Sequence, residues 1–521
     1  MLINLRDKSI VADRRLKMAT LGIVIATVVY LAALLIMGAT FAKENHTVGD
    51  YYLGGRKLGP LVTAMSAEAS DMSSWLLMGL PGVAIATGVC DVFWTALGLG
   101  IGTYLNWLLV AKKLRKYSEK NNSVTIPDFF ENRFRDKSHI LMLLSSIIIV
   151  VFFIPYVGSG FAACGKLFSS LFKIDYGIAM IVSAAVIIGY TATGGFMAAS
   201  VTDFVQSIIM TVALISVVCF GLSTVGGFEA VGDYATSLDG YISLLAMHDF
   251  ETGTATSYGG IITIVFTMAW GLGYFGMPHI LLRFMAIKDP EKIKLSRRIS
   301  TIWVFIAMGV AIFIGVIART MMYAGVIPNL EDPERAIIVI AQTLAEHNFA
   351  ASLLAGVILA GILACTMSTC DSQMLAASSS VSENILHETF GIKMNEHMQM
   401  VMARIVLVVI AAIGVIIAWN PDSSVFGIVS FAWAGFGAAF GPVMLLALFW
   451  KHTNKYGAIA GMLGGGVMIF VWKFWIKPLG GVFGIYELLP AFLIALFLCA
   501  VVSLATPSPE QEIIDEFESI K

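Results

Sequence analysis

Long apolar segments recur from one end of this chain to the other, and they constrain its fold more than any other feature. Cutting the sequence at charged and at Gly-, Pro- or Asn-rich breaks leaves about thirteen segments long enough to cross a bilayer. They are residues 18–42, 60–88, 91–112, 139–171, 176–193, 197–225, 259–286, 297–325, 348–380, 400–419, 423–450, 456–476 and 485–506. Because backbone in lipid must satisfy its own hydrogen bonds, we predict an all-α polytopic membrane protein.

Charge and motifs exclude several other classes of protein. Hydrophobic residues make up 58% of the chain and charged residues 13%, against roughly 25% charged in an ordinary soluble domain. The 33 basic and 35 acidic residues nearly balance, and no basic tract is interleaved with aromatic residues, so nucleic acid is not an expected partner. Neither an HExxH motif nor a nucleophile elbow occurs, so the chain is not expected to be an enzyme.

Lysine and arginine in the loops predict the orientation in the membrane. The loops KKLRKYSEKNNSVTIPDFFENRFRDK and KDPEKIKLSRR are the richest in these residues, whereas the loop at 226–258 is acidic and contains none of them. Basic loops belong on the cytoplasmic side of the cell membrane, which places the N-terminus outside and the C-terminus inside. The basic N-terminal tail opposes this orientation, and the agreement among the loops favours it.

The stretch SAEASDMSSW, residues 66–75, places two carboxylates inside the second apolar segment. A carboxylate at the centre of a bilayer helix costs roughly 2.5–3.5 kcal/mol, so Glu68 and Asp71 are expected to face a cavity, a partner or an ion. Small residues surround them, and Leu80-Pro81-Gly82 follows. We therefore predict a helix that breaks within the membrane. In secondary transporters such breaks expose backbone carbonyls to the driving cation.

A second interrupted segment, TMAWGLGYFGMPHI, follows five segments later, with Gly271, Gly273, Gly276 and Pro278 crowded together. Two breaks in corresponding positions indicate an inverted repeat. Because the offset of five is odd, the two units would insert in opposite orientations, and the core is predicted to be a five-plus-five inverted repeat. Helix packing alone is the alternative role of membrane glycines, and we prefer it for isolated glycines elsewhere in the chain.

Polar residues of two other segments are candidates to meet the first break. The ninth segment contains Ser368, Thr369, Asp371 and Ser372, and the spacing of its hydroxyls places them along one helix face. Hard cations prefer several oxygen ligands, so two hydroxyls and exposed carbonyls would suit a sodium ion. Asp203 is a further carboxylate within the sixth segment. For any single hydroxyl, bonding to its own helix is an equally good explanation.

Four long motifs carry a resemblance to a known family. They are ASDMSSWLLMGLPG (69–82), WGLGYFGMPHILLRFMA (270–286), MSTCDSQML (367–375) and FAWAGFGAAFGP (431–442). In these motifs, and over most of its length from Asp50, the chain resembles the bacterial sodium/proline symporters of the solute:sodium symporter family. The resemblance implies a neurotransmitter/sodium symporter-like core with two broken helices, one flanking helix before it and two after it. It also implies Na+ as the coupling ion.

The resemblance also assigns cation ligands by position. The sodium site would consist of three backbone carbonyls and two hydroxyls, from Ala69, Met72, Cys365, Ser368 and Thr369. Asp71 matches a functionally important acidic residue of the first broken helix. A cation-coupling group, or second sodium site, would involve Asp203, Asp371 and Ser372 beside Ser368.

Substrate contacts implied by the resemblance surround the two breaks, on Ser73, Trp75, Tyr156, Trp270, Tyr274 and Pro278. Three positions depart from the family pattern. Glu68 stands where relatives usually have a small or neutral residue, Ser74 where they usually have Gly, and Met277 where Gln is common. Glu68 therefore introduces proton coupling as an alternative, and Met277 removes a polar group near the substrate.

The chain is accordingly expected to import a small amino acid, with L-proline favoured, together with sodium by alternating access. Membrane lipid is its expected surroundings. Open alternatives are the same fold carrying another amino acid, pantothenate or a sugar, or coupling to protons. A transporter-like sensor is disfavoured because the short tail TPSPEQEIIDEFESIK has no room for a signalling domain.

Five parts are expected along the chain. Residues 1–45 form an extracytoplasmic tail and an extra first helix, and residues 46–225 the first five-helix repeat. Residues 226–258 are an acidic extracytoplasmic loop. The second, inverted repeat covers residues 259–451, and residues 452–521 form two C-terminal helices and a short cytoplasmic tail.

Overall fold

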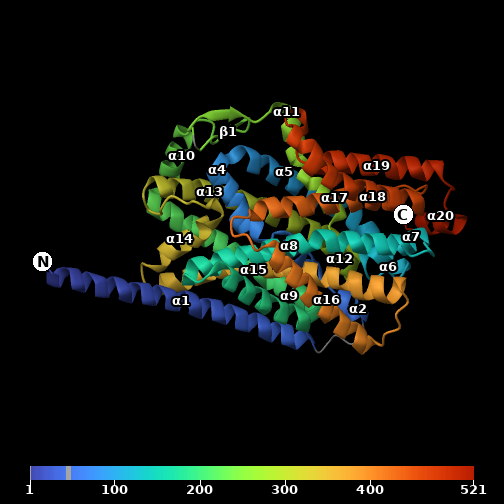
Figure 1. The fold of residues 1–521 in the computed structure, drawn as a ribbon, viewed down its shortest axis with the longest axis horizontal. Coiled ribbons are helices and arrows are strands. Elements are labelled where there is room, and N and C mark those ends of the chain that lie inside the picture. Colours follow the sequence, from blue (N-terminus) through green and yellow to red (C-terminus); the bar gives the residue numbers. More distant parts are fainter. Residues whose placement is uncertain (1, 43–47, 251, 521) are drawn as a thin grey trace.

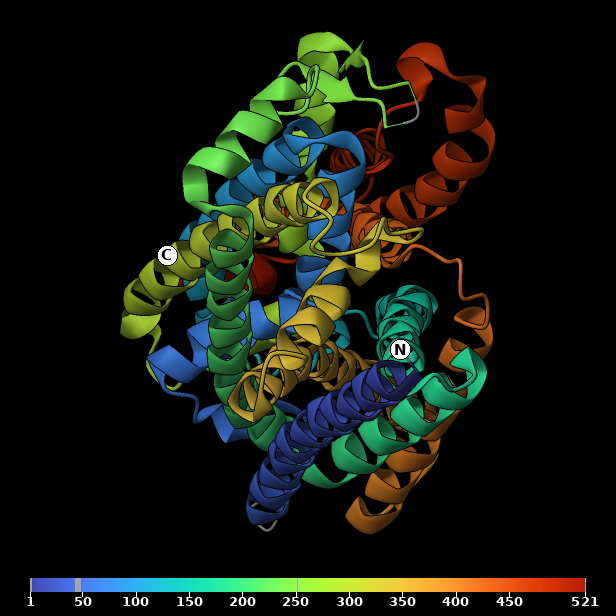
Figure 2. The same cartoon turned by 90° about the vertical axis from the view of Figure 1, so that its left-hand side faces the viewer.

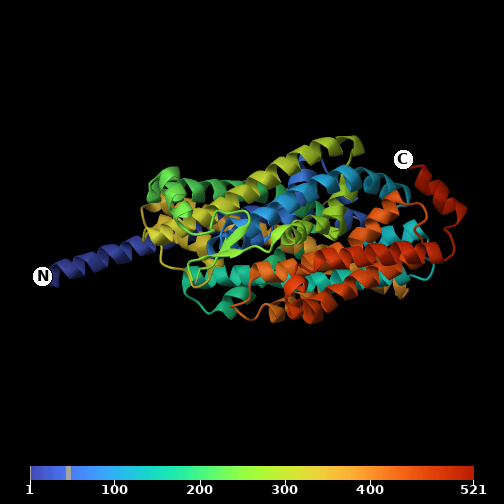
Figure 3. The same ribbon diagram turned by 90° about the horizontal axis from the view of Figure 1, so that it is seen from above.

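The computed structural model describes residues 2–42, 48–250 and 252–520. Long helices run roughly side by side along one axis and build an elongated bundle (Figure 1). Seen after a quarter turn, α1 (Leu2–Ala42) lies at the outside of this bundle (Figure 2). The N-terminal end of α1 and the last helix, α20 (Gln511–Glu518), lie at opposite ends of the molecule (Figure 3).

The first half of the described chain contains helices and one small hairpin. After α1 these elements are α2 (Val48–Leu53), α3 (Pro60–Asp71), η2 (Trp75–Gly79), α4 (Leu80–Thr87), α5 (Val89–Leu105), η3 (Asn106–Val110), α6 (Ala111–Lys120), α7 (Ile126–Phe134), α8 (Ile140–Phe172), α9 (Tyr176–Val225), α10 (Gly227–Ser237), β1 (Ala246–His248) and β2 (Ala255–Ser257). The two strands pair antiparallel, with Met247 opposite Thr256.

The second half of the described chain is helical. Its elements before the C-terminal pair are α11 (Gly260–Met268), η4 (Ala269–Gly276), α12 (Pro278–Ala286), α13 (Ile293–Tyr323), α14 (Ala336–Ala345), α15 (Phe349–Ser379), η7 (Ser380–Thr389), α16 (Glu396–Ile417) and α17 (Val425–Phe449). The C-terminal helices are α18 (Lys455–Val471) and α19 (Leu488–Ala505), followed by α20. Short 3-10 turns lie at Gly54–Arg56, Pro290–Lys292, Pro333–Arg335, Lys477–Leu479 and Gly481–Phe483, and a short π-helix lies at Trp472–Ile476.

Ten helices of the described residues are long and apolar enough to cross a membrane, and one bent pair would make an eleventh. The protein is therefore a multi-pass membrane protein. Two of the predicted segments, 60–88 and 176–193, coincide with shorter apolar helices, Trp75–Thr87 and Tyr176–Gly189. The number of thirteen spans stays a prediction. The fifth and sixth predicted segments are joined within α9 at Gly195, whose φ of 67° is a backbone conformation that glycine tolerates.

Both predicted helix breaks are present. Helix α3 ends at Asp71, and Met72 leaves the helical ladder with a ψ of 64° before η2 begins at Trp75. In the second broken segment Met277 is extended, with a ψ of 108°, and Pro278 opens α12. The two pieces of this segment are bent by 48°. Proline suits the first helical position because it lacks the backbone N–H that would be unpaired there.

Helix α15 is central to the packing that brings the breaks together. It lies against α9, α1, α8, α14, α16 and α3, and its residues from Ile358 to Ser379 are all buried. An element buried on every side can present its polar residues only to other helices. The hydroxyls of the ninth predicted segment are therefore held inside the protein and not against lipid.

Isolated glycines of α5 let it approach the second broken segment closely. A Cβ atom on Gly102 would lie 2.3 Å from the carbonyl oxygen of Gly271, and one on Gly98 would lie 2.3 Å from that of Met268. The packing interpretation of these glycines is thus confirmed. The glycines of the break itself have the same role, since a Cβ on Gly273 would lie 2.0 Å from Nε1 of Trp433.

We expect Gly102→Leu to lower the folded yield strongly, because its side chain meets backbone that cannot move aside, and overpacking costs about 1–3 kcal/mol or more. Gly309→Leu is the matched control, since a Cβ there meets nothing within 4 Å. The measurement is the monodisperse fraction in size-exclusion chromatography and the thermal midpoint of each variant. Equal yields and midpoints for the two variants would contradict the close packing of α5 on η4.

Candidate functional site

Helix α15 meets the first break through two hydroxyls. Ser368 Oγ donates to the carbonyl oxygen of Ala69 at 2.7 Å and also approaches that of Cys365 at 3.2 Å. Thr369 Oγ1 donates to the Cys365 carbonyl at 3.0 Å. Four of the five predicted sodium ligands therefore form one buried cluster, and the fifth, Met72, lies at the end of α3 and is fully buried. Hydroxyl groups can rotate and present lone pairs, so this cluster can turn several oxygens towards a cation.

Asp71 links the two broken segments. The hydroxyl of Tyr274, in η4, donates to Asp71 Oδ2 at 2.5 Å, and the indole N–H of Trp75 donates to the Asp71 carbonyl at 3.2 Å. The other carboxylate oxygen, Oδ1, is buried and has no hydrogen-bond partner among the described residues. A carboxylate with one free oxygen retains capacity to accept a hydrogen bond or to face a cation.

Asp203 lies in a buried network of hydrogen bonds, in which Arg283 supplies the positive charge. Ser66 and Ser70 donate to Asp203 Oδ2 at 2.7 and 3.0 Å, and Arg283 Nη2 lies 3.1 Å from the same oxygen. The guanidinium also donates to Ser372 Oγ at 2.5 Å. Asp203 and Ser372 are therefore joined through Ser70, which also bonds Ser372 at 3.0 Å, and through Arg283, which the sequence analysis did not single out.

The remaining members of the predicted second cation site do not join this network directly. Ser368 belongs to the cluster at Ala69, as described above. Asp371 Oδ1 accepts from the backbone N–H of Ser372 at 3.0 Å, and its Oδ2 has no hydrogen-bond partner among the described residues. The sequence HILLRFMA contained a signal for Arg283. Like Glu68, it is a charged residue in an apolar segment, where an unpaired charge is costly.

Glu68 faces a different neighbour from Asp71. Its Oε1 accepts from Thr103 Oγ1 at 3.1 Å and from the indole of Trp107 at 3.2 Å. Both donors lie on the α5–η3 helix, so this carboxylate points away from the hydroxyls of α15. Oε2 of Glu68 is buried and has no hydrogen-bond partner in the described part of the chain.

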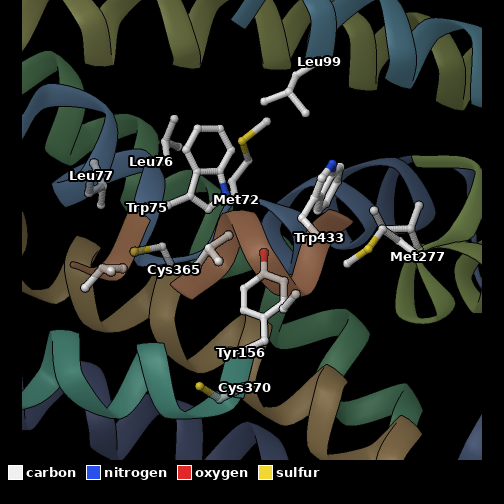
Figure 4. Packing of buried hydrophobic residues seen from close by; sticks show 14 of the residues in the cluster. Met72, Trp75, Leu76, Leu77, Leu99, Tyr156, Met277, Cys365, Cys370 and Trp433 are labelled. Carbon is white, nitrogen blue, oxygen red and sulfur yellow. The ribbon is translucent and has the colours of Figure 1, made fainter. Parts of the chain in front are cut away.

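The predicted substrate residues gather around the same breaks. Tyr156 of α8 points towards the space beside Met72, Trp75 and Met277, with Trp433 of α17 nearby (Figure 4). The hydroxyls of Tyr156, Ser73 and Ser74 are buried and lack hydrogen-bond partners within the described residues. Buried polar groups are normally paired, so these hydroxyls retain the capacity to bond a polar ligand.

Two aromatic residues that the sequence analysis missed, Trp433 and Tyr486, pack against predicted substrate residues. Trp433 Nε1 donates to the carbonyl of Trp270 at 2.8 Å, and the Trp433 ring meets that of Tyr274 edge-on, 5.0 Å between centroids. Trp270 in turn stacks on Tyr486, with centroids 4.9 Å apart. Trp433 lies in the quoted motif FAWAGFGAAFGP, whereas Tyr486 gave no signal beyond being aromatic. Pro278 begins α12 beside Met277.

Comparisons with known proteins agree with this architecture. A sodium/proline symporter of Staphylococcus aureus is 39% identical over 488 residues, covering 92% of each chain. A sodium/proline symporter of its strain USA300 / TCH1516 is 39% identical over 489 residues, again covering 92% of each chain.

Two solved structures share the fold. The substrate-bound outward-open state of a Na+-coupled sialic acid symporter superposes with a TM-score of 0.76 at 17% identity, covering 94% of this chain and 99% of that one. A nucleobase-cation-symport-1 family transporter in a closed conformation gives a TM-score of 0.54 at 13% identity, covering 90% and 98%. The predicted symporter-like helical core with two broken helices is thereby confirmed.

The family described as the sodium:solute symporter family matches residues 51–465, which include both breaks and the hydroxyl cluster of α15. Together with the curated relatives, this match establishes that the chain belongs to the sodium:solute symporter family.

Proposed function

We propose that this protein imports L-proline together with sodium by alternating access. The observation that carries the proposal is the bond between Ser368 of α15 and the Ala69 carbonyl, which is freed at the first helix break. An ion held there would join a broken segment to a helix of the surrounding scaffold. Membership of the family supports sodium as the coupling ion, and the curated relatives named sodium/proline symporters support proline.

The sodium site that we propose consists of the carbonyls of Ala69, Met72 and Cys365 and the hydroxyls of Ser368 and Thr369. Carbonyl and hydroxyl oxygens are suitable ligands for a hard cation. The last carbonyls of α3 carry the partial negative charge of a helix C-terminus. The sodium ion would replace the hydrogen bonds that these groups now form with one another.

The proposed substrate site lies between the two breaks and α8. Ser73 and Tyr156 offer hydroxyls without partners, and Pro278 opens a half-helix whose first N–H groups favour a carboxylate. The walls would come from Trp75, Trp270 and Tyr274. An aromatic ring face attracts an ammonium group while its body packs on an aliphatic ring, which suits the zwitterion of proline.

The coupling carboxylates in the proposal are Asp71, Asp203 and Asp371, with Ser372 beside them. Coupling requires that each ligand bind the two conformations with different affinity. Asp71 is well placed for this role because it joins the first break to Tyr274 of the second. Glu68, with one unpartnered oxygen, carries the alternative of proton coupling.

The remaining features of the proposal concern topology. We propose that the chain lies in the cell membrane with its N-terminus outside and its C-terminus in the cytoplasm, and that it has no enzymatic activity. Residues 46–225 and 259–451 would form the two inverted repeats. The loop 226–258 would lie outside, and the flanking parts 1–45 and 452–521 would pack around the core.

Uptake of radiolabelled proline into proteoliposomes tests the proposal. An inward sodium gradient is compared with an equal potassium gradient, and unlabelled amino acids are added as competitors. We expect sodium-dependent accumulation that only proline-like compounds reduce. Accumulation driven by a pH gradient without sodium, and lost in Glu68→Gln, would instead establish proton coupling. If neither a sodium gradient nor a pH gradient drives proline uptake, proline is not the substrate.

Asp71→Asn is expected to raise the sodium concentration for half-maximal uptake by about tenfold or more, since one contact to a charged group is worth about 1.5–3 kcal/mol. The control is Asp91→Asn. Asp91 also accepts a hydrogen bond from a tyrosine hydroxyl, that of Tyr258 at 2.6 Å, but it lies in the first turn of α5 and belongs to neither proposed site. Equal sodium activation in both variants would remove Asp71 from the coupling path.

A further inference from the structure

An apolar cavity of about 250 Å³ opens between four helices on the lipid-facing side of the bundle. Its floor includes Cys164 of α8 and Met367 of α15, both buried, and its outer wall includes the exposed Val182 of α9. Leu31 of α1 closes another side. The one hydroxyl in the lining, on Ser183, is bonded to the Ala179 carbonyl of its own helix at 2.7 Å. The cavity therefore offers no hydrogen bond to water.

A second cavity of about 290 Å³ adjoins the first and is polar at its rim. Phe172 lines both cavities, so they adjoin at this residue. Lys173 and Glu346 lie at the rim of the second one, and both are exposed. Among the described residues, neither side chain takes part in an ion pair or hydrogen bond. A cation and an anion thus stand unpaired at the mouth of an apolar slot.

The depth of the two cavities matches one leaflet of a bilayer. Lys173 lies in the turn between α8 and α9, which places it at the membrane surface. From Phe172 to Cys164 the groove follows α8 for about 12 Å at 1.5 Å per residue. Half of a hydrocarbon core of about 30 Å is about 15 Å. The groove thus extends from the headgroup level nearly to the midplane.

We propose that this two-part cavity is a binding site for one phospholipid with a primary amine in its headgroup, of the phosphatidylethanolamine type. One acyl chain fills the apolar cavity beneath Phe172. The Lys173 ammonium binds the lipid phosphate, and the Glu346 carboxylate accepts hydrogen bonds from the lipid amine. The headgroup charges and the rim charges are complementary, which a purely anionic lipid would not achieve beside Glu346.

The position of the site suggests what the lipid does. Leu363 and Met367, four residues apart, face the cavity from one side of α15, while Ser368 and Thr369 of the same helix face α3 and their own backbone. A bound acyl chain would therefore support α15 from the membrane side. The inference concerns lipid binding alone and does not depend on the transported solute.

Native mass spectrometry of the purified full chain tests the proposal. The protein is titrated with phosphatidylethanolamine, phosphatidylglycerol and phosphatidylcholine of identical acyl chains. We expect one phosphatidylethanolamine to bind about fivefold more tightly than the other two lipids, as one charge contact at a membrane surface allows. Lys173→Gln is expected to weaken binding of all three lipids and Glu346→Gln to remove the preference for the amine. Lys294→Gln, at an exposed lysine of α13, is the charge control.

A bulky residue in the groove tests the acyl chain separately. Val182→Trp should abolish the binding of the one tightly held phosphatidylethanolamine, whereas Ile178→Trp should not. Both positions lie on α9, and their side chains are 56% and 58% exposed. Ile178 does not line the cavity. Equal binding by the two tryptophan variants would overturn the site. Equal binding of the three lipids to the unaltered chain would contradict the proposed preference for a primary amine in the headgroup.

Discussion

Arg283→Met is expected to cost about 3–5 kcal/mol of stability, because it leaves the Asp203 carboxylate buried without its cation. Arg283 is 1% exposed and Asp203 fully buried. The arginine also donates to Ser66 and to the carbonyl of His279 at the start of α12. Its loss would therefore loosen α12 from α3 and α9 together. The measurement is thermal unfolding in detergent without sodium, which separates stability from cation binding.

A double variant distinguishes an ion pair from simple loss of packing. Arg283→Met with Asp203→Asn should recover most of the loss, since both charges are then absent and the asparagine still accepts from Ser66 and Ser70. Arg298→Met, at an exposed position of α13, should change the midpoint little. If the double variant is no more stable than Arg283→Met, the pair does not stabilise the fold by charge.

Ser368→Ala should raise the sodium concentration for half-maximal proline uptake about tenfold or more, because a ligand contact to a charged group contributes about 1.5–3 kcal/mol. Thr369→Ala should have a smaller effect, since Thr369 bonds only within α15 whereas Ser368 also reaches Ala69 of α3. Proline affinity at saturating sodium should change much less in both variants. A sodium-binding assay without proline should show the same order.

Ser378→Ala is the matched control for these two variants. Ser378 lies on the same helix, and its hydroxyl donates to the carbonyl of Ala403 at 2.7 Å. It thus makes the same kind of contact between helices, ten residues beyond Ser368 in sequence. If Ser378→Ala raises the sodium requirement as much as Ser368→Ala does, the effect comes from helix packing, and the cation site must be placed elsewhere.

The apolar segments and both helix breaks could be predicted from the sequence because their causes are local. A run of about twenty apolar residues predicts a spanning helix from its own composition. Pro278 disfavours helical backbone at Met277, and the serines after Asp71 compete with the helix for backbone hydrogen bonds. The hydroxyls of Ser368 and Thr369 could be placed on one helix for the same reason, since the period of the α-helix is fixed.

The partners of the buried charges could not be predicted in this way. Glu68 and Asp71 are three residues apart, yet one accepts from Thr103 and Trp107 of the α5–η3 helix and the other from Tyr274 of η4. Which neighbour each carboxylate meets depends on how α3 is rotated and on what packs beside it.

The same limit applies to the contacts of Arg283, Trp433 and Tyr486. The sequence gives their positions but not their partners. The salt bridge of Arg283 to Asp203 joins residues 80 apart, and Trp433 donates a hydrogen bond to a carbonyl 163 residues away. Local backbone preference and hydropathy are properties of neighbouring residues, so the sequence alone specifies apolar segments, breaks and helix faces. Contacts between distant segments depend on helix rotation and packing, which are decided only when the helices pack against one another.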